Sequence, residues 1–308
     1  MTALPPLDAS RWTHRAGHFG LDASNIGEAL DAIAVYLAAG GAPPSRQEAR
    51  DLVAAVLDVP RFWPSAHRDR ALTPPESAAM ERAAARLAAG MPFAYAVGSA
   101  AFRTLTLEID ERVLIPRPET EVLVDLVLDS SDRGSGTVID VGTGSGCIAL
   151  SLAGEGTFDR VIATDLSSAA LDVARANAGR LLGANAGRIE FRQGEFLAPC
   201  AAERATVVVS NPPYISPSEA GELPALVRDW EPGLALFADD DGMAAIARIA
   251  QEATTVLVSG GLLALEVDSR RAERAAQCVA ATGAYRDIAV QPDLTGRARF
   301  VLARRVEE

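Results

Sequence analysis

The spacing of apolar residues divides the chain into two parts with different predicted structures. Between Asn25 and Ala89, apolar residues recur every three or four positions, which is typical of amphipathic helices. Pro43-Pro44 and Pro74-Pro75 interrupt this pattern, and a new helical start follows each pair within a few residues. We therefore expect a small helical domain over residues 25–98. Residues 1–24 lack this pattern and are predicted to form an N-terminal extension.

Residues 99–118 are predicted to link the helical domain to the rest of the chain. Apolar and polar positions over residues 102–115 favour a β-hairpin, with its turn near Asp110-Glu111. A helix is expected to begin near Pro118, because proline suits the first helical turn. Glu119 and Glu121 would compensate the positive end of the helix dipole.

From Thr137 onward, short apolar strands alternate with helical segments. Strands are expected at 137–141, 160–164, 188–192, 206–210, 261–267, 285–290 and 298–303. Helices are expected near 146–153, 168–182, 242–257 and 269–281. This alternation predicts an α/β, Rossmann-like domain over residues 119–308, with a seven-stranded, mostly parallel sheet. The last two strands have no helix between them and should pair antiparallel.

The first of these strands ends in a glycine-rich turn, Gly142-Thr143-Gly144-Ser145-Gly146. Glycine permits a sharp turn and lets a ligand contact the backbone, and such turns bind ligands at the carboxyl end of a strand. Asp165 ends the next strand, where a carboxylate can accept hydrogen bonds from both hydroxyls of a ribose. The spacing G-x-G-x-G differs from the G-x-G-x-x-G of dinucleotide sites. It favours S-adenosyl-L-methionine as the ligand, over a dinucleotide or a turn without a ligand.

A second motif, Asn211-Pro212-Pro213-Tyr214, directly follows the strand predicted at 206–210. The two prolines make this backbone rigid and hold the residue before them extended. An amide nitrogen is a poor nucleophile, so its methylation requires acceptors for its N–H groups. The side-chain oxygen of Asn211 and the carbonyl of Pro212 are suited to this, and the ring of Tyr214 can stack on a planar amide. The alternative is a rigid turn with no chemical role.

Composition narrows the functional classes. The net charge is −12 and every basic residue is arginine, whereas a protein that grips duplex nucleic acid usually carries a basic field. No apolar run reaches the length of a membrane span, and no secretory signal precedes the helices, so we expect a cytoplasmic protein. The three cysteines fit neither a disulfide framework nor a zinc site, and no metal is expected.

Several motifs together resemble those of a known family. They are Arg112 to Glu121 (RVLIPRPETE), Asp140 to Gly146 (DVGTGSG) and Ser210 to Ile215 (SNPPYI), with shorter matches around Glu231-Pro232, Asp241-Gly242 and Asp293 to Arg297. This combination is similar to the glutamine methyltransferases of peptide chain release factors, the PrmC/HemK family. The likeness covers roughly residues 30–303.

The resemblance implies a class I S-adenosyl-L-methionine-dependent methyltransferase domain behind a small N-terminal helical domain that docks the release factor. Its substrate would be the glutamine of the Gly-Gly-Gln motif in class I release factors, and its product S-adenosyl-L-homocysteine. Gly142 to Gly146 would contact the methionine part, Asp165 the ribose and Phe196 the adenine, with Glu195 beside it. Asn211 to Tyr214 would hold the glutamine, and Asn211 would also contact the cofactor.

Three alternatives remain at this stage. A DNA or RNA adenine-N6 methyltransferase would use the same Asn-Pro-Pro-Tyr motif on a flipped base. A relative acting on a ribosomal-protein glutamine would share the chemistry. A partner protein that binds the cofactor without turnover would also keep the glycine turn. The acidic charge and the segment from Ile115 to Glu121 favour the release factor enzyme, without direct binding of nucleic acid or a membrane.

Overall fold

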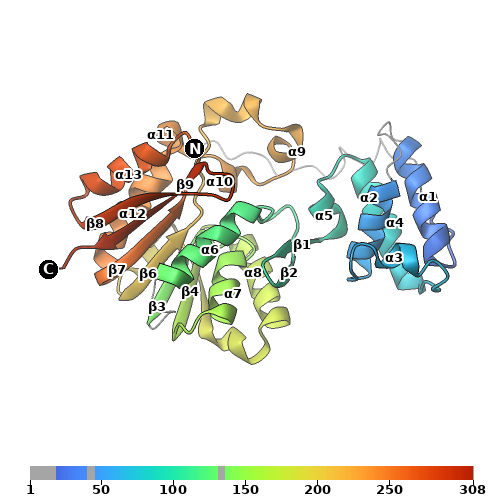
Figure 1. The fold of residues 1–308 in the computed structure, drawn as a ribbon, viewed down its shortest axis with the longest axis horizontal. Coiled ribbons are helices and arrows are strands. Elements are labelled where there is room, and N and C mark those ends of the chain that lie inside the picture. The colour runs from blue at the N-terminus through green and yellow to red at the C-terminus, as the bar shows by residue number, and fades with distance from the viewer. Residues whose placement is uncertain (1–18, 40–45, 131–135, 308) are drawn as a thin grey trace. The chain divides into compact units, whose positions relative to one another are not determined.

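The computed structural model describes residues 19–39, 46–130 and 136–307 (Figure 1). The chain divides into two compact units, Met1–Ser99 and Ala100–Glu308.

The first unit is helical. Its helices are α1 (Ile26–Ala39), α2 (Arg46–Val56), α3 (Trp63–Ala66), α4 (Pro74–Ala88) and α5 (Phe93–Val97). Ile33, Leu52 and Met80 are fully buried in its core, as the helical spacing of apolar residues requires. Of the predicted extension, residues 1–18 lie outside the described residues. Residues 19–24 belong to this unit, since Leu21 is buried in the same core.

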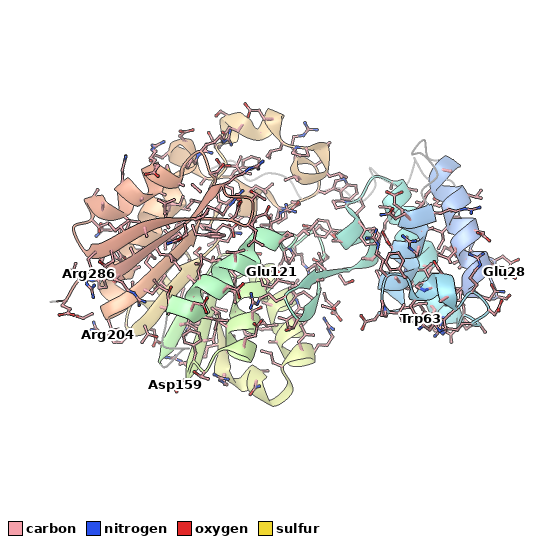
Figure 2. All side chains as sticks on the ribbon, in the orientation of Figure 1. Glu28, Trp63, Glu121, Asp159, Arg204 and Arg286 are labelled. Carbon is pink, nitrogen blue, oxygen red and sulfur yellow. The ribbon has the colours of Figure 1, made fainter. Side chains whose placement is uncertain are left out.

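The predicted hairpin is present, but its turn lies elsewhere than expected. Strands β1 (Ser99–Phe102) and β2 (Leu105–Glu108) are joined at Arg103-Thr104, so the turn predicted at Asp110-Glu111 was wrong. Arg103 has a φ of 53°, which costs energy for a residue with a Cβ. Contacts with the helices offset this cost, because its backbone N–H donates to Glu121 (labelled in Figure 2) and its guanidinium donates to Glu155.

A seven-stranded sheet forms the centre of the second unit, in the order β5-β4-β3-β6-β7-β9-β8. Its strands are β3 (Thr137–Val141), β4 (Arg160–Asp165), β5 (Ile189–Gln193), β6 (Ala205–Ser210), β7 (Leu257–Glu266), β8 (Tyr285–Pro292) and β9 (Ala298–Arg305). The first five strands in this order are parallel, whereas β9 pairs antiparallel with both β7 and β8. The predicted sheet and its antiparallel last pair are confirmed.

Helices connect these strands. They are α6 (Pro118–Ser130), α7 (Cys147–Glu155), α8 (Ser168–Leu181), α9 (Ala225–Arg228), α10 (Gly233–Leu236), α11 (Asp239–Gly242), α12 (Ala244–Val256) and α13 (Ala272–Ala281), with 3-10 helices η2 (Gly183–Arg188), η3 (Ala198–Cys200) and η4 (Pro217–Glu222). The predicted helix 242–257 begins two residues late because Gly242 has a left-handed φ of 78°. The predicted helix 269–281 begins at Ala272, because Asp268 accepts the backbone N–H of Arg270 in a turn.

The order of the strands creates one special position. The chain runs from β3 outward through β4 to β5, then returns to β6 on the other side of β3. The loops after β3 and β6 therefore diverge, and such a switch point is where ligands bind in open α/β sheets. Val141 and Ser210, the last residues of these strands, are paired, and the Ser210 hydroxyl donates to the Val141 carbonyl at 2.7 Å.

Asn177 of α8 connects the hairpin to the loop at this switch point. Its side chain donates to the carbonyls of Glu108 and Ser145 and accepts the Glu108 N–H. In Asn177→Ala these backbone groups lose their partners, and we expect the free energy of unfolding to fall by about 2–3 kcal/mol. Urea unfolding measures this change. The exposed Asn185 of η2 supplies the control, since Asn185→Ala should leave stability nearly unchanged; equal effects of the two substitutions would contradict the prediction.

Candidate active site

The glycine-rich turn lies at the carboxyl end of β3, on one side of the switch point. The N–H groups of Gly142 and Thr143 both donate to the Thr164 carbonyl at 2.9 Å, which ties the turn to β4. Gly142, Gly144 and Gly146 all have positive φ. A Cβ added at Gly142 or Gly144 would meet open space, whereas one at Gly146 would lie 2.5 Å from Leu150 Cδ1. The first two glycines thus leave room for a ligand, and the third permits helix packing.

Asp140 lies directly beneath this turn and is fully buried. Its Oδ2 accepts the Thr143 hydroxyl at 2.7 Å and the Ala149 N–H at 3.2 Å. Its Oδ1 is buried without a hydrogen-bond partner among the residues that the structure describes. Burial raises the pKa of Asp140 to about 7, although both hydrogen bonds lower it. Asp140 therefore anchors the turn through Oδ2, and its Oδ1 is a buried acceptor without a partner in the described part of the chain.

Asp165 ends β4 beside the glycine turn. Its Oδ2 accepts the N–H of Gly144 and its Oδ1 accepts that of Ser167, each at 2.9 Å. These bonds fix the orientation of the carboxylate and leave further lone pairs on both oxygens. Burial raises the pKa of Asp165, and the backbone N–H groups oppose that rise. An oriented carboxylate at this position has the acceptors that a pair of vicinal hydroxyls requires.

The segment after β5 reaches the same edge of the sheet. The Thr164 hydroxyl donates to the Phe196 carbonyl at 3.0 Å, and the Gly194 N–H donates to the Asp165 carbonyl at 3.0 Å. Phe196 has a φ of 45° and packs partly buried against the core. The structure thus brings Phe196 close to Asp165 along the backbone. The neighbouring Glu195 is exposed.

Asn211 to Tyr214 leave β6 on the other side of the switch point. The Asn211 Nδ2 donates to the Thr120 hydroxyl at 3.0 Å, and Asn211 itself is half-buried. The following Ile215 pairs with the chain near Phe237, donating to the Leu236 carbonyl and accepting the Ala238 N–H. This pairing supports the motif from outside the sheet, so its backbone is held at both ends.

Tyr214 packs against the core beside this motif. Burial, followed by the nearby negative charge of Glu266, raises the pKa of Tyr214 to about 12. Its carbonyl oxygen lies 2.1 Å from the position that a Cβ on residue 242 would occupy, so only glycine fits there. The buried guanidinium of Arg271 donates to the Asp241 carbonyl at 2.7 Å and to Glu219 at 2.6 Å, which fixes the chain around Gly242.

Two polar residues of this site were not identified from the sequence. Thr120 of α6 and Glu266 at the end of β7 are both buried, and the Thr120 hydroxyl donates to Glu266 Oε2 at 2.7 Å. Burial raises the pKa of Glu266 to about 7. The sequence offered one indication, since an acidic residue ending an apolar parallel strand points to the same edge as Asp165.

That segment is also tied to the connection between β6 and β7. Arg117 forms an ion pair with the buried Glu231 at 2.5 Å, and the Ile115 N–H donates to the same carboxylate at 3.4 Å. Glu231 therefore holds the start of α6 in place beside Asn211.

The described part of the chain lacks both a metal-binding cluster and a membrane-spanning helix. Residues 19–39, 46–130 and 136–307 hold no group of three or more His, Cys, Asp or Glu side chains arranged to bind a metal ion. Nor does any helix within them combine the length and apolar character needed to cross a membrane.

Comparison with known proteins gives matches in both units. The chain matches the family model of the methyltransferase small domain over residues 118–225 and that of the PrmC N-terminal domain over residues 28–98. It is 43% identical over 282 residues to the release factor glutamine methyltransferase of Moorella thermoacetica, which covers 91% of this chain and 99% of that protein. The protein of the same description from Cereibacter sphaeroides is 39% identical over 277 residues, covering 90% and 97%.

A solved methyltransferase from Pyrococcus furiosus aligns with a TM-score of 0.50 and 18% identity, covering 67% of this chain and 92% of that one. At this identity the likeness concerns the fold, and it agrees with the Rossmann-like sheet described above.

The buried Asp140 should make stability depend on pH. Its pKa is raised on folding, so the folded state binds more protons than the unfolded state between about pH 4 and 7, and stability falls as pH rises through this range. Asp140→Asn should remove this contribution, so the free energy of unfolding should fall less steeply with rising pH, by up to about 1.4 kcal/mol per pH unit. Urea unfolding at several pH values tests this. The exposed Asp172 gives the matched control, Asp172→Asn, which should keep the wild-type slope; an unchanged slope in the Asp140 variant would refute the assignment.

Proposed function

Because the chain belongs to the release factor glutamine methyltransferase family, we propose that it methylates the glutamine of the Gly-Gly-Gln motif in class I peptide chain release factors. The methyl donor in this proposal is S-adenosyl-L-methionine, and the acceptor is the side-chain amide nitrogen. The observation that carries the proposal is the carboxamide of Asn211. It lies across the switch point from the glycine turn, and its Nδ2 is already engaged by Thr120.

The glycine turn and its neighbours fit the cofactor. The open space at Gly142 and Gly144 suits the methionine part. Asp165 is oriented to accept the ribose hydroxyls, and Phe196 offers an apolar ring for the adenine, with Glu195 beside it. Thr143 and Ser145 complete the turn. When bound, S-adenosyl-L-methionine supplies an electrophilic methyl group on a sulfonium, and S-adenosyl-L-homocysteine is left.

The Asn-Pro-Pro-Tyr motif fits the substrate amide. The lone pair of an amide nitrogen is delocalised, so the nitrogen must be held in position and its N–H groups engaged. Asn211 Oδ1 and the Pro212 carbonyl would accept these two hydrogens, with Pro213 fixing the backbone between them and Tyr214. The ring of Tyr214 would lie against the planar amide.

No general base is needed, because a methylated amide nitrogen that carries positive charge loses its proton readily. The raised pKa of Tyr214, about 12, keeps its hydroxyl protonated at neutral pH. We therefore assign Tyr214 a positioning role through its ring rather than a role as a base.

The alternatives receive less support. A DNA or RNA adenine-N6 methyltransferase would need a basic surface, whereas the net charge is −12. A ribosomal-protein glutamine would suit the same motif, but the relatives at up to 43% identity are described as acting on release factors. In our proposal the helical unit docks the release factor, in the cytoplasm and without direct nucleic-acid binding.

Transfer of labelled methyl from S-adenosyl-L-methionine tests the substrate. We expect label on an intact class I release factor and none on a variant with the motif glutamine changed to alanine. Duplex DNA and a purified ribosomal-protein fraction serve as competing acceptors. Label on either of these, with none on the release factor, would leave the methyltransferase assignment in place and overturn the proposed substrate.

Substitutions should separate substrate from cofactor binding. Asn211→Ala should reduce methylation at least about 100-fold while the Kd for S-adenosyl-L-methionine changes little, because it removes a group that acts on the reacting nitrogen. Asp165→Ala should instead weaken cofactor binding, since it removes the acceptor for the ribose. Equilibrium binding and turnover assays measure the two effects. A loss of cofactor affinity in Asn211→Ala as large as that in Asp165→Ala would show that Asn211 acts mainly on the cofactor, and it would contradict its assignment to the substrate amide.

A further inference from the structure

Three side chains from separate segments form one continuous row of hydrogen bonds. Glu266 ends β7, Thr120 lies in the first turn of α6, and Asn211 follows β6. The Thr120 hydroxyl donates to Glu266 at 2.7 Å and accepts Asn211 Nδ2 at 3.0 Å. Glu266 and Thr120 are 1% and 3% exposed, so water does not compete for these bonds. The strand register brings Asn211 and Glu266 together, because Ser210 pairs with Leu265 and they are the next residues, and Thr120 reaches them from α6, which packs against β7.

The chemistry of these groups gives the row a direction. A carboxylate can only accept hydrogen bonds, and a threonine hydroxyl has a single hydrogen to donate. The Thr120 hydrogen therefore points to ionised Glu266, and its lone pairs remain for Asn211. Only the NH2 group of Asn211 can occupy that position. Its Oδ1 is then turned away from Thr120.

The oxygen and the NH2 group of a carboxamide are nearly equal in size, so shape alone does not determine which of them faces the substrate, and the hydrogen bond to Thr120 does. If Asn211 were rotated by half a turn, its NH2 group would face the NH2 of a substrate amide, donor against donor. Such an arrangement leaves both groups unpaired in a partly buried site, which costs about 1–3 kcal/mol per group.

We propose that Glu266 and Thr120 are positioning residues that fix the carboxamide of Asn211 with its oxygen toward the substrate amide. This proposal rests on the function given above, since it assumes that Asn211 Oδ1 accepts an N–H of the substrate. Neither residue touches the reacting atoms, and both act through Asn211.

The charges around Glu266 set its ionisation, and its ionisation determines whether the Asn211 carboxamide is fixed in one orientation. Burial and, to a smaller degree, Glu119 disfavour the carboxylate, whereas the Thr120 hydrogen bond and the positive charges of Arg299 and Arg117 favour it. Among the residues that the structure describes, Tyr214 and Cys147 also feel the charge of Glu266. Protonated Glu266 can donate to Thr120, and the Thr120 hydrogen then becomes available to Asn211 Oδ1. The opposite orientation of the carboxamide is allowed in that state.

Three variants test the proposal, with methylation of a class I release factor as the readout. Thr120→Val removes both hydrogen bonds at nearly constant volume, and Thr120→Ser keeps the hydroxyl. Groups that orient a ligating side chain in metal sites typically contribute about 10- to 100-fold, and we expect kcat to fall by a similar factor in Thr120→Val. Thr120→Ser should restore most of this loss, and the Kd for S-adenosyl-L-methionine should stay within about twofold in both. Thr206→Val is the matched control, because the Thr206 hydroxyl donates to the Thr137 carbonyl at the far end of β6. It should retain wild-type kcat.

The pH profile separates orientation from mere support of the fold. Burial raises the pKa of Glu266 to about 7, so wild-type kcat should decline as pH falls through this value. In Glu266→Gln the side chain cannot titrate, so the part of the decline in kcat that Glu266 causes should disappear. The kcat of this variant at alkaline pH should also be lower than that of the wild type. Thr120→Val should also lack this part of the decline in kcat, because the row of hydrogen bonds between Glu266 and Asn211 is broken.

The outcomes distinguish this proposal from the function on which it rests. A wild-type enzyme that leaves the release factor unlabelled would refute the proposed function. An active wild type in which Thr120→Val has the same kcat as Thr206→Val would overturn the positioning role alone. The role would also be overturned if Thr120→Ser failed to recover activity although its thermal unfolding matched the wild type.

Discussion

The site depends on the reversal of strand order between β3 and β6. Because the chain builds the sheet outward from β3 in one direction and then resumes beside β3 in the other, two loops diverge from neighbouring strand ends. One carries the glycine turn and the other the Asn-Pro-Pro-Tyr motif, although they are far apart in the sequence. The bond from the Ser210 hydroxyl to the Val141 carbonyl, at 2.7 Å, joins the two strands at the point where they separate. The two loops can therefore face each other on a rigid base.

The two halves of the site share one building principle. Under each loop lies a buried carboxylate, Asp140 on one side and Glu266 on the other, and each accepts a threonine hydroxyl at 2.7 Å. Burial raises the pKa of both to about 7, because removal from water disfavours the charged carboxylate, so keeping these groups inside the fold costs free energy. The hydroxyl groups of Thr143 and Thr120 offset this cost, and they anchor the glycine turn and the start of α6.

Much of this arrangement could be predicted because its signals are local. Every strand of the sheet was located from apolar runs, and the glycine turn and the Asn-Pro-Pro-Tyr motif are each contiguous. The hairpin turn at Arg103 could not be found this way, since an arginine gives no turn signal and its left-handed backbone depends on Glu121 and Glu155. The bond between Thr120 and Glu266 joins residues 146 positions apart, and the packing of α6 against β7 brings them together.

Gly242 shows how far constraint can extend from the reacting atoms. It would contact no ligand, yet the Tyr214 carbonyl lies where any larger residue would place its Cβ, and Arg271 closes the other side. A gene library that varies only Asn211 to Tyr214 would leave this position out. Gly242 limits where the backbone of Tyr214 can lie. Redesign toward a bulkier methyl acceptor would therefore have to change Gly242, Arg271 and Tyr214 together.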